Sequence, residues 1–394
     1  RLVLLAAIIG FPFAAVAGWF YDITSQGVYR TPPADADDAF DAQLKMRDLA
    51  FLSTMLAVWA IAVYVVHTPP VPERSIAMLV FDFPEQDEEI RDFAVNLRND
   101  LHDHLGRVAT FLSVSPDSVD KVNRSWPIFR VAEQLGVAYV LTGTVDRIGD
   151  VAVVSPRLVD GRSGSILWIP EQPFDREPTL DARYDIRSAI AMGISNALGK
   201  KLSAREYEVL ARRPTISKGA NDAYIRGRTL LHRRHDEALV LAAAQFDKAI
   251  ELDPVFAEAY AELAITLMLA TDEFELVERG YDEASRLIDR AMELDSDLAE
   301  AHAARGFYLW GGKREIDAAL ESLRRAIELN PTYEPSYHWM AAIYRQDRGE
   351  HEAAFRITEN LARRSPYQRN VFWTHIGELL ARGRIQEAAQ RVSN

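Results

Sequence analysis

The 394-residue chain is acidic, since 58 aspartate and glutamate residues outnumber 45 lysine and arginine residues and give a formal net charge of −13. Nucleic-acid binders need clustered basic residues to contact phosphates, and no such run occurs, so we expect no nucleic-acid partner for this segment. The chain lacks cysteine, which excludes disulfides, iron–sulfur clusters and thiolate zinc sites, and its length favours two or three folding units.

The N-terminal region contains two long apolar segments. Residues 1–20 include the uncharged run Leu2–Phe20, and residues 49–66 form a second uncharged run. About 20 apolar residues are needed to cross the hydrocarbon core of a bilayer. We therefore predict two transmembrane helices. The alternatives are a cleaved signal peptide for the first segment and a pair of buried core helices.

The segment between these helices, residues 21–48, is predicted to be a cytoplasmic loop. Three basic residues lie near its predicted membrane ends: Arg30, Lys45 and Arg47. Basic loops stay in the cytoplasm, and no basic residue follows the second helix until Arg74, so we expect the chain after Val66 to lie outside the cytoplasm. Residues 67–74 are proline-rich and predict a stiff linker.

Residues 75–205 have the pattern of a small α/β domain. Short apolar runs bounded by polar, Gly or Pro residues predict strands at Ser75–Phe81, Phe111–Val114, Tyr139–Arg147, Val151–Asp160 and Ile166–Phe174. Apolar residues at helical spacing predict helices at Ile90–Leu105, Ile128–Leu135 and Leu180–Leu198. This order predicts one mixed sheet with helices packed on it.

Three blocks of this domain resemble the TolB N-terminal-like domain of bacterial membrane proteins that contain tetratricopeptide (TPR) repeats: residues 75–83, 133–168 and 184–199. Residues 10–30 resemble the juxtamembrane stretch of the same proteins. The resemblance implies an inner (plasma) membrane protein with its domains mostly on the periplasmic side. It also implies that a cytoplasmic winged helix or adenylate cyclase domain can precede such a segment. The acidic stretch at residues 85–89 departs from the family pattern and leaves a ligand site there unsupported.

The α/β domain contains no recognised catalytic motif. His102, Asp103 and His104 form the best metal-like cluster, but residues two apart on a helix point to different faces and cannot easily share an ion. Residues 161–164 lack the Gly-Lys-Ser/Thr of a phosphate-binding loop, so we predict a hairpin turn. The sequence therefore predicts no metal, no cofactor and no enzymatic activity.

Residues 219–394 contain a repeated motif. AIELDP begins at Ala249, AMELDS at Ala291 and AIELNP at Ala326, which gives intervals of 42 and 35 residues. A period near 34 residues with one insertion is typical of TPR repeats. We predict about four to five helical hairpins, the last incomplete, in an all-α solenoid. Arg305 interrupts the packing pattern of this repeat, because it occupies a position that is usually apolar. Aromatic, aliphatic and small residues match the packing positions elsewhere: Tyr260, Leu263, Ala264, Tyr337, Met340, Ala341, Trp373, Ile376 and Gly377.

The first helices of stacked TPR hairpins line a concave groove. Positions on these helices predict a groove that binds a protein or peptide partner: Glu258, Ile265, Met268, Glu300, Phe307, Trp310, His338, Arg345, Gln346, Thr374 and Arg382. Their mixture of aromatic and charged side chains suits an extended peptide or a partner helix. For Phe307 and Trp310 the alternative is packing between repeats.

These features together predict a multi-domain fold of two transmembrane helices, a small α/β domain and a TPR solenoid. The predicted function is a scaffold or sensor, anchored in the lipid bilayer, that binds a protein partner. The alternative is a receptor whose α/β domain senses a ligand and controls an upstream cytoplasmic effector. A homo-oligomer and a complex subunit both remain open.

Overall fold

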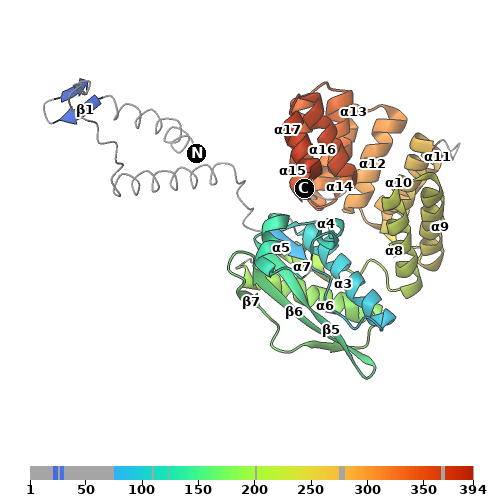
Figure 1. Ribbon diagram of the computed structural model, residues 1–394. Coiled ribbons are helices and arrows are strands. Elements are labelled where there is room, and N and C mark those ends of the chain that lie inside the picture. The colour runs from blue at the N-terminus through green and yellow to red at the C-terminus, as the bar shows by residue number, and fades with distance from the viewer. Residues whose placement is uncertain are drawn as a thin grey trace. The chain divides into compact units, whose positions relative to one another are not determined.

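The computed structural model describes two separate units of the chain, one up to Val71 and one from Pro72 to Asn394 (Figure 1). Its described residues are 21–24, 27–30, 75–108, 111–123, 125–199, 202–274, 280–364 and 369–393. In the first unit, β1 (Tyr21–Thr24) pairs antiparallel with β2 (Gly27–Arg30), a hairpin inside the predicted loop. All further elements that the structure describes belong to the second unit.

The fold class predicted from the sequence is wrong in its membrane-spanning part. The predicted spans, residues 1–20 and 49–66, lie outside the described residues. Within the described part of the chain, no helix combines the length and apolar character that a bilayer crossing requires. The helix α3 (Glu88–Arg107) is long enough at 20 residues, but charged side chains occur along its whole length. The predicted inner-membrane and periplasmic location depended on those spans, so it is not supported either.

A mixed sheet forms the centre of the α/β domain. Its strand order is β4-β3-β5-β6-β7, with β8 paired to β6, and β3 runs parallel to both of its neighbours. The strands are β3 (Ser75–Met78), β4 (Leu112–Ser113), β5 (Tyr139–Ile148), β6 (Val151–Asp160), β7 (Ile166–Trp168) and β8 (Phe174–Arg176). The single strand predicted over Ile166–Phe174 is therefore two, because β7 and β8 pair with opposite ends of β6.

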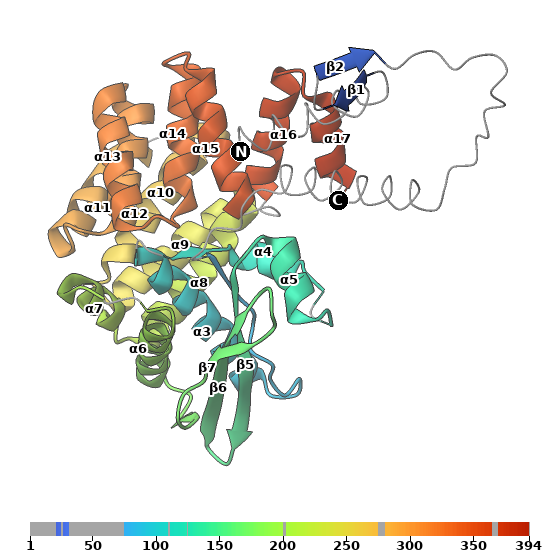
Figure 2. The same cartoon turned by 90° about the vertical axis from the view of Figure 1, so that its left-hand side faces the viewer.

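Helices cover both faces of this sheet. Leu101 of α3 and Ile190 of α6 (Leu180–Ala197) pack in one core cluster with Leu141 and Val154 of the sheet. On the other face lie the helices α4 (Pro116–Asp120) and α5 (Ile128–Leu135). Figure 2 shows α6 and α5 on opposite sides of the β5–β6 ribbon. The short helices α4 and α7 (Ala204–Ala211) were not predicted.

A close approach between α6 and β7 gives a test of this packing. A Cβ atom on Gly193 would lie 2.1 Å from Trp168 Cζ2, so we expect Gly193→Ala to lower the free energy of unfolding by about 1–3 kcal/mol. Gly377, in the helix α16 (Arg369–Ala381), is the matched control, because its Cβ would meet no atom within 4 Å. There alanine should raise helix stability by up to about 1 kcal/mol. Urea denaturation of both variants measures the difference, and equal effects would contradict this packing.

The remaining helices pack as successive hairpins in chain order (Figure 1). They are α8 (Lys218–Arg233), α9 (Asp236–Leu252), α10 (Ala257–Phe274), α11 (Gly280–Leu294), α12 (Ala299–Tyr308), α13 (Ile316–Leu329), α14 (Glu334–Gln346), α15 (His351–Arg364), α16 (Arg369–Ala381) and α17 (Ile385–Ser393). The predicted helical repeats are confirmed. A hairpin exposes its apolar face unless another stacks on it, which is why these helices form one continuous array.

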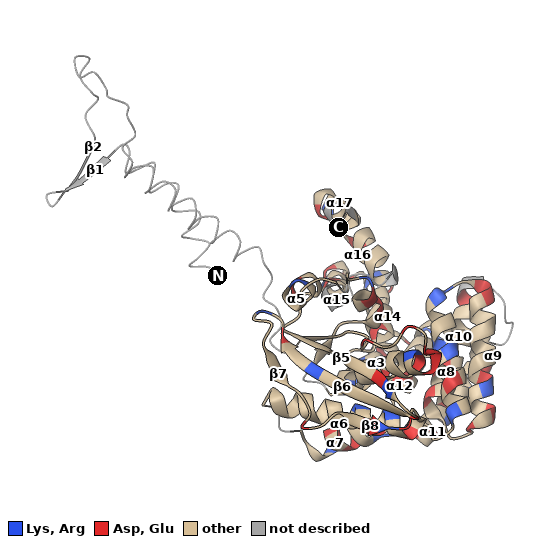
Figure 3. Ribbon diagram, turned by 60° about the horizontal axis from the view of Figure 1, so that its bottom comes forward, with Lys and Arg blue, Asp and Glu red and all other residues tan. Residues whose placement is uncertain are grey.

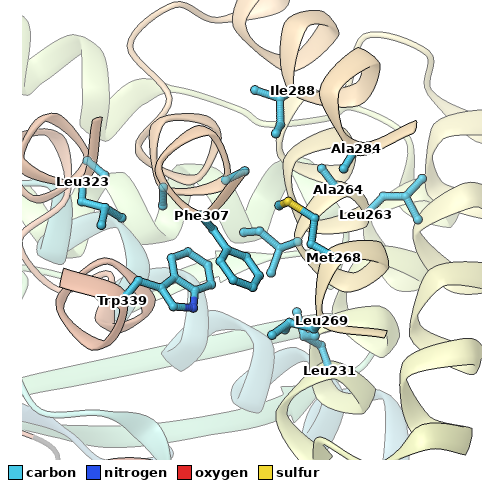
Figure 4. Close-up of a cluster of buried hydrophobic side chains, with 14 of the residues drawn as sticks. Leu231, Leu263, Ala264, Met268, Leu269, Ala284, Ile288, Phe307, Leu323 and Trp339 are labelled. Atoms are coloured by element: carbon cyan, nitrogen blue, oxygen red, sulfur yellow. The ribbon is translucent and has the colours of Figure 1, made fainter. Parts of the chain in front are cut away.

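The core of the helical array holds residues that had two interpretations in the sequence. Figure 4 shows Phe307 of α12 facing Trp339 of α14, and their rings stack with centroids 4.6 Å apart and planes 10° apart. Met268 of α10 is fully buried in the same cluster. Phe307 and Met268 thus pack between hairpins. For Phe307, this packing was the alternative to a place in the groove.

The third hairpin is irregular where Arg305 interrupts the repeat pattern. Arg305 is exposed, and α12 continues into a π-helix over Leu309–Lys313. Gly311 and Gly312 of this π-helix lie so close to Tyr281 that a Cβ atom on either would clash with its ring or hydroxyl. In the last hairpin, Trp373 is 58% exposed, so its predicted packing role is wrong. It meets the edge of Phe372 instead.

Candidate functional site

The C-terminal end of α3 lies against the first helices of the solenoid. Arg107 of α3 donates through Nη2 to Glu300 Oε1 of α12 at 3.0 Å and lies 3.8 Å from Glu258 Oε1 of α10. All three side chains are nearly buried, with 11%, 7% and 3% exposed. A buried arginine between two carboxylates holds the helices together, because loss of the arginine would leave two uncompensated charges.

Further ion pairs join the same two domains. Arg228 of α8 donates to Asp103 of α3 at 2.5 Å. Arg212, which follows α7, pairs with Glu258 at 3.1 Å and with Asp295. Figure 3 shows acidic and basic residues along α3, α8 and α12, where these contacts are made. Ion pairs between arginines and carboxylates of the two domains therefore join the α/β domain to the N-terminal half of the solenoid.

A cavity of about 530 Å³ lies between the two domains. Its lining includes His102 and Arg107 of α3, Tyr224 of α8, Glu262 of α10 and Trp339 of α14. Burial, opposed by nearby Arg228 and aided by Glu300, raises the pKa of Glu262 to about 7. Burial lowers the pKa of His102 to about 4, so this histidine is neutral at pH 7. At neutral pH, His102 is therefore uncharged and Glu262 is only partly ionised.

The predicted groove residues fall into three groups. Ile265, Met268 and Phe307 are buried in the core of the solenoid. Glu258 and Glu300 bind arginines of the α/β domain and its C-terminal extension, as described above. The remaining six lie on α14 and α16 or at a helix end, where they are partly or fully exposed: Trp310, His338, Arg345, Gln346, Thr374 and Arg382.

Three residues of the last group have internal partners. Trp310 Nε1 donates to Asp347 at 2.8 Å, Arg345 pairs with Glu378 at 2.9 Å and Arg382 pairs with Glu352 at 2.7 Å. Gln346 is exposed, and His338 and Thr374 are half-buried. The structure therefore does not bring the eleven predicted residues onto one open surface. Those of α10 and α12 are covered, and those of α14 and α16 are accessible.

The residues that join the domains were missing from the sequence prediction. Arg107 and Glu300 are 193 residues apart, and neither belongs to a motif that points to the other. The His102–Asp103–His104 cluster holds separate contacts: His102 Nδ1 is 2.6 Å from Ser113 Oγ, Asp103 binds Arg228 and His104 Nδ1 is 3.1 Å from the Asp100 carbonyl. No three metal-binding side chains gather at one point among the residues the structure describes.

One curated protein is similar to part of this chain. Putative adenylate cyclase 3 of Rhizobium meliloti (strain 1021) is 30% identical over 199 residues, which is 50% of this chain and 33% of that protein. The chain thus spans about a third of the length of this relative. No family model matches the chain.

Several solved structures are similar to part of this chain. A thermophilic TPR protein of Thermus thermophilus is 20% identical over 50% of this chain and 91% of its own, with a TM-score of 0.35. PilF of Pseudomonas aeruginosa is 24% identical over 44% of this chain and 73% of its own, with a TM-score of 0.33. MamA is 22% identical over 45% of this chain and 89% of its own, with a TM-score of 0.28. The solenoid is TPR-like. That statement rests on the repeat period and on the stacked hairpins of the chain itself.

Proposed function

We propose that this protein is a non-catalytic scaffold that binds a protein or peptide partner through the C-terminal hairpins of its TPR-like solenoid, α14 to α17. The observation that carries the proposal is the contact of α3 with Glu258 and Glu300. It supports the idea that the first helices suit a polypeptide segment, because a helix of the same chain already docks on them. It also leaves α14 and α16 as the accessible part of the predicted groove.

Accessible side chains on the last hairpins suit a partner surface. Trp373 is 58% exposed, and Leu380 and Ile385 are 51% and 65% exposed. Tryptophan is enriched among the residues that dominate binding energy in protein interfaces. The predicted groove residues Gln346 and Thr374 lie on the same hairpins. We therefore place the partner surface on α14 to α17.

Replacement of Trp373 tests this surface. We expect Trp373→Ala to weaken partner affinity at least tenfold, because an exposed aromatic anchor would lose its contact area. The partner is first identified by crosslinking to the full chain in cells and mass spectrometry, and its affinity is then measured by calorimetry. Val255→Ala is the matched control, since Val255 is 65% exposed between α9 and α10. Equal affinities for the two variants would reject the proposed surface.

The similarity to the Rhizobium meliloti protein favours a second candidate function. In this candidate the TolB-like α/β domain senses a ligand and controls an effector, such as an adenylate cyclase, joined upstream of residue 1. The experiment is an assay of cyclic AMP formation by the complete gene product, with wild-type Arg107 and with Arg107→Met. An activity that changes with the substitution supports the candidate. A gene product without an attached effector domain rejects it.

A further inference from the structure

A separate cavity, of about 370 Å³, lies on the face of the mixed sheet that α4 and α5 cover. Its lining includes Leu79 and Val80 after β3, Thr142 of β5 and Val159 of β6. Ile128, the first residue of α5, also lines it, and the β5–β6 ribbon continues past this helix (Figure 2). The volume lies within the range of about 300–1,000 Å³ that small-molecule pockets occupy.

The cavity lies at the carboxyl end of two parallel strands. Met78 is the last residue of β3 and pairs with Leu141 of the parallel strand β5. Thr142 therefore lies level with the end of β3, and Leu79 and Val80 follow that end directly. In open α/β sheets, ligands bind in the crevice outside the carboxyl ends of the strands. The place of this cavity in the sheet thus favours a ligand site.

The floor of the cavity is aliphatic. Leu79, Val80 and Val159 are buried, and Ile128 is half-buried. Ile166 of β7 also lines the cavity and leaves 55% of its surface in solvent. An apolar group that covers these side chains would remove their surface from water, which favours binding by about 25 cal/mol per Å².

Two side chains of opposite charge, Asp82 and Arg157, line the same cavity. Both are exposed. Among the residues that the structure describes, neither of them has an ion-pair or side-chain hydrogen-bond partner. By contrast, Arg147 of the same sheet pairs with Asp87 and Glu89. The cavity therefore offers one carboxylate and one guanidinium that are both free to contact a ligand.

The strand register places these two charges on opposite sides of β5. Asp82 pairs with Thr144, and Arg157 pairs with Thr142, which lies two residues earlier on the same face of β5. Neighbouring strands are about 4.8 Å apart, and two residues advance a strand by about 6.6 Å, so the Cα atoms of Asp82 and Arg157 are on the order of 12 Å apart. A small ligand that lies over Thr142 can reach both side chains.

The two charges and the aliphatic floor together fit a zwitterion. An ammonium group donates hydrogen bonds to a carboxylate, and a guanidinium donates two parallel hydrogen bonds to a carboxylate. A ligand with a single charge would leave either Asp82 or Arg157 without a partner. An α-amino acid carries its ammonium and carboxylate groups on one carbon atom, and its side chain extends away from both.

We propose that this cavity binds an aliphatic α-amino acid, whose ammonium group contacts Asp82, whose carboxylate contacts Arg157 and whose side chain covers Leu79 and Val159. The site goes beyond the scaffold function, since none of its residues lies on α14 to α17. It would also supply a ligand class for the second candidate function.

Calorimetric titration of the full chain with L-leucine, L-isoleucine and L-valine tests this proposal. We expect at least one of them to bind. The amide of the bound amino acid lacks the carboxylate, its N-acetyl derivative lacks the ammonium group, and each should bind at least tenfold more weakly. Absence of binding for all three amino acids at millimolar concentration would overturn the proposal, and so would equal binding of either derivative.

Substitutions locate the binding in this cavity. Asp82→Asn and Arg157→Gln each remove one charge with little change of shape, and each should weaken the affinity for the amino acid at least tenfold. Asp146→Asn and Arg162→Gln are the matched controls, because both residues are exposed in the same domain and neither lines the cavity. Unchanged affinity in either cavity variant would overturn the assignment.

The derivatives and the variants together show which charge meets which group. The Arg157→Gln variant should bind the amino acid and its amide alike, because the ligand carboxylate has lost its partner. The Asp82→Asn variant should bind the amino acid and its N-acetyl derivative alike. Discrimination as strong as that of the wild type would contradict the proposed orientation. Partner capture by the Trp373 variant is measured separately, so failure of the scaffold proposal does not decide this one.

Discussion

Replacing Arg107 with methionine should lower the free energy of unfolding by about 3–5 kcal/mol. Arg107 donates to Glu300 at 3.0 Å and lies 3.8 Å from Glu258, and all three side chains are nearly buried. Methionine keeps most of the apolar stem, so the loss would come from two carboxylates left without their shared cation. Urea denaturation followed by tryptophan fluorescence measures the change.

Two further variants separate this effect from a general loss of charge. Arg290→Met removes an arginine that is 45% exposed and paired with Glu293 on α11, and it should cost less than about 1 kcal/mol. Adding Glu300→Gln to Arg107→Met should recover part of the lost stability, because one of the stranded charges is removed. A loss below about 1 kcal/mol for Arg107→Met would show that the domain contact does not depend on this arginine.

The second large effect concerns pH and Glu262. Burial raises the pKa of this carboxyl to about 7 from its ordinary value of 4.5. Between pH 4.5 and pH 7, Glu262 of the folded protein therefore keeps a proton that the same residue of the unfolded chain has released. The stability linked to this proton is fully present below pH 4.5 and is lost as the pH rises through 7. The loss is on the order of 3 kcal/mol.

Comparison of the wild type with Glu262→Gln isolates this contribution. Glutamine cannot ionise, so the stability of the variant should lie within about 1 kcal/mol of the wild type near pH 5 and exceed it at pH 8 by on the order of 3 kcal/mol. Groups from several helices surround Glu262 and are shared by both proteins, so they cancel in the difference: Asp103, Arg107, Tyr224, Arg228, Glu258, Glu300 and Tyr333. A difference that does not change between pH 5 and pH 8 would contradict the raised pKa.

The amino-acid sequence by itself determined those elements whose ends have local signals. The helix α5 ends at Leu135, as predicted, because Gly136 adopts the left-handed conformation with φ of 65°. The strand β6 has its predicted bounds, since a turn with Gly149 at φ of 64° precedes it. The repeat period likewise identified the helical hairpins, because each hairpin carries its own apolar face.

Tertiary structure decided what depends on contacts between distant residues. Residues 166–174 form two strands because they meet opposite ends of β6, which their own sequence does not encode. The repeat pattern placed Glu258 and Glu300 on first helices, but Arg107, which covers them, lies 193 residues before Glu300. Local periodicity reports which face of a helix is buried and not which segment buries it. The covered part of the predicted groove and the cavity beside it therefore became visible only when the two domains were seen together.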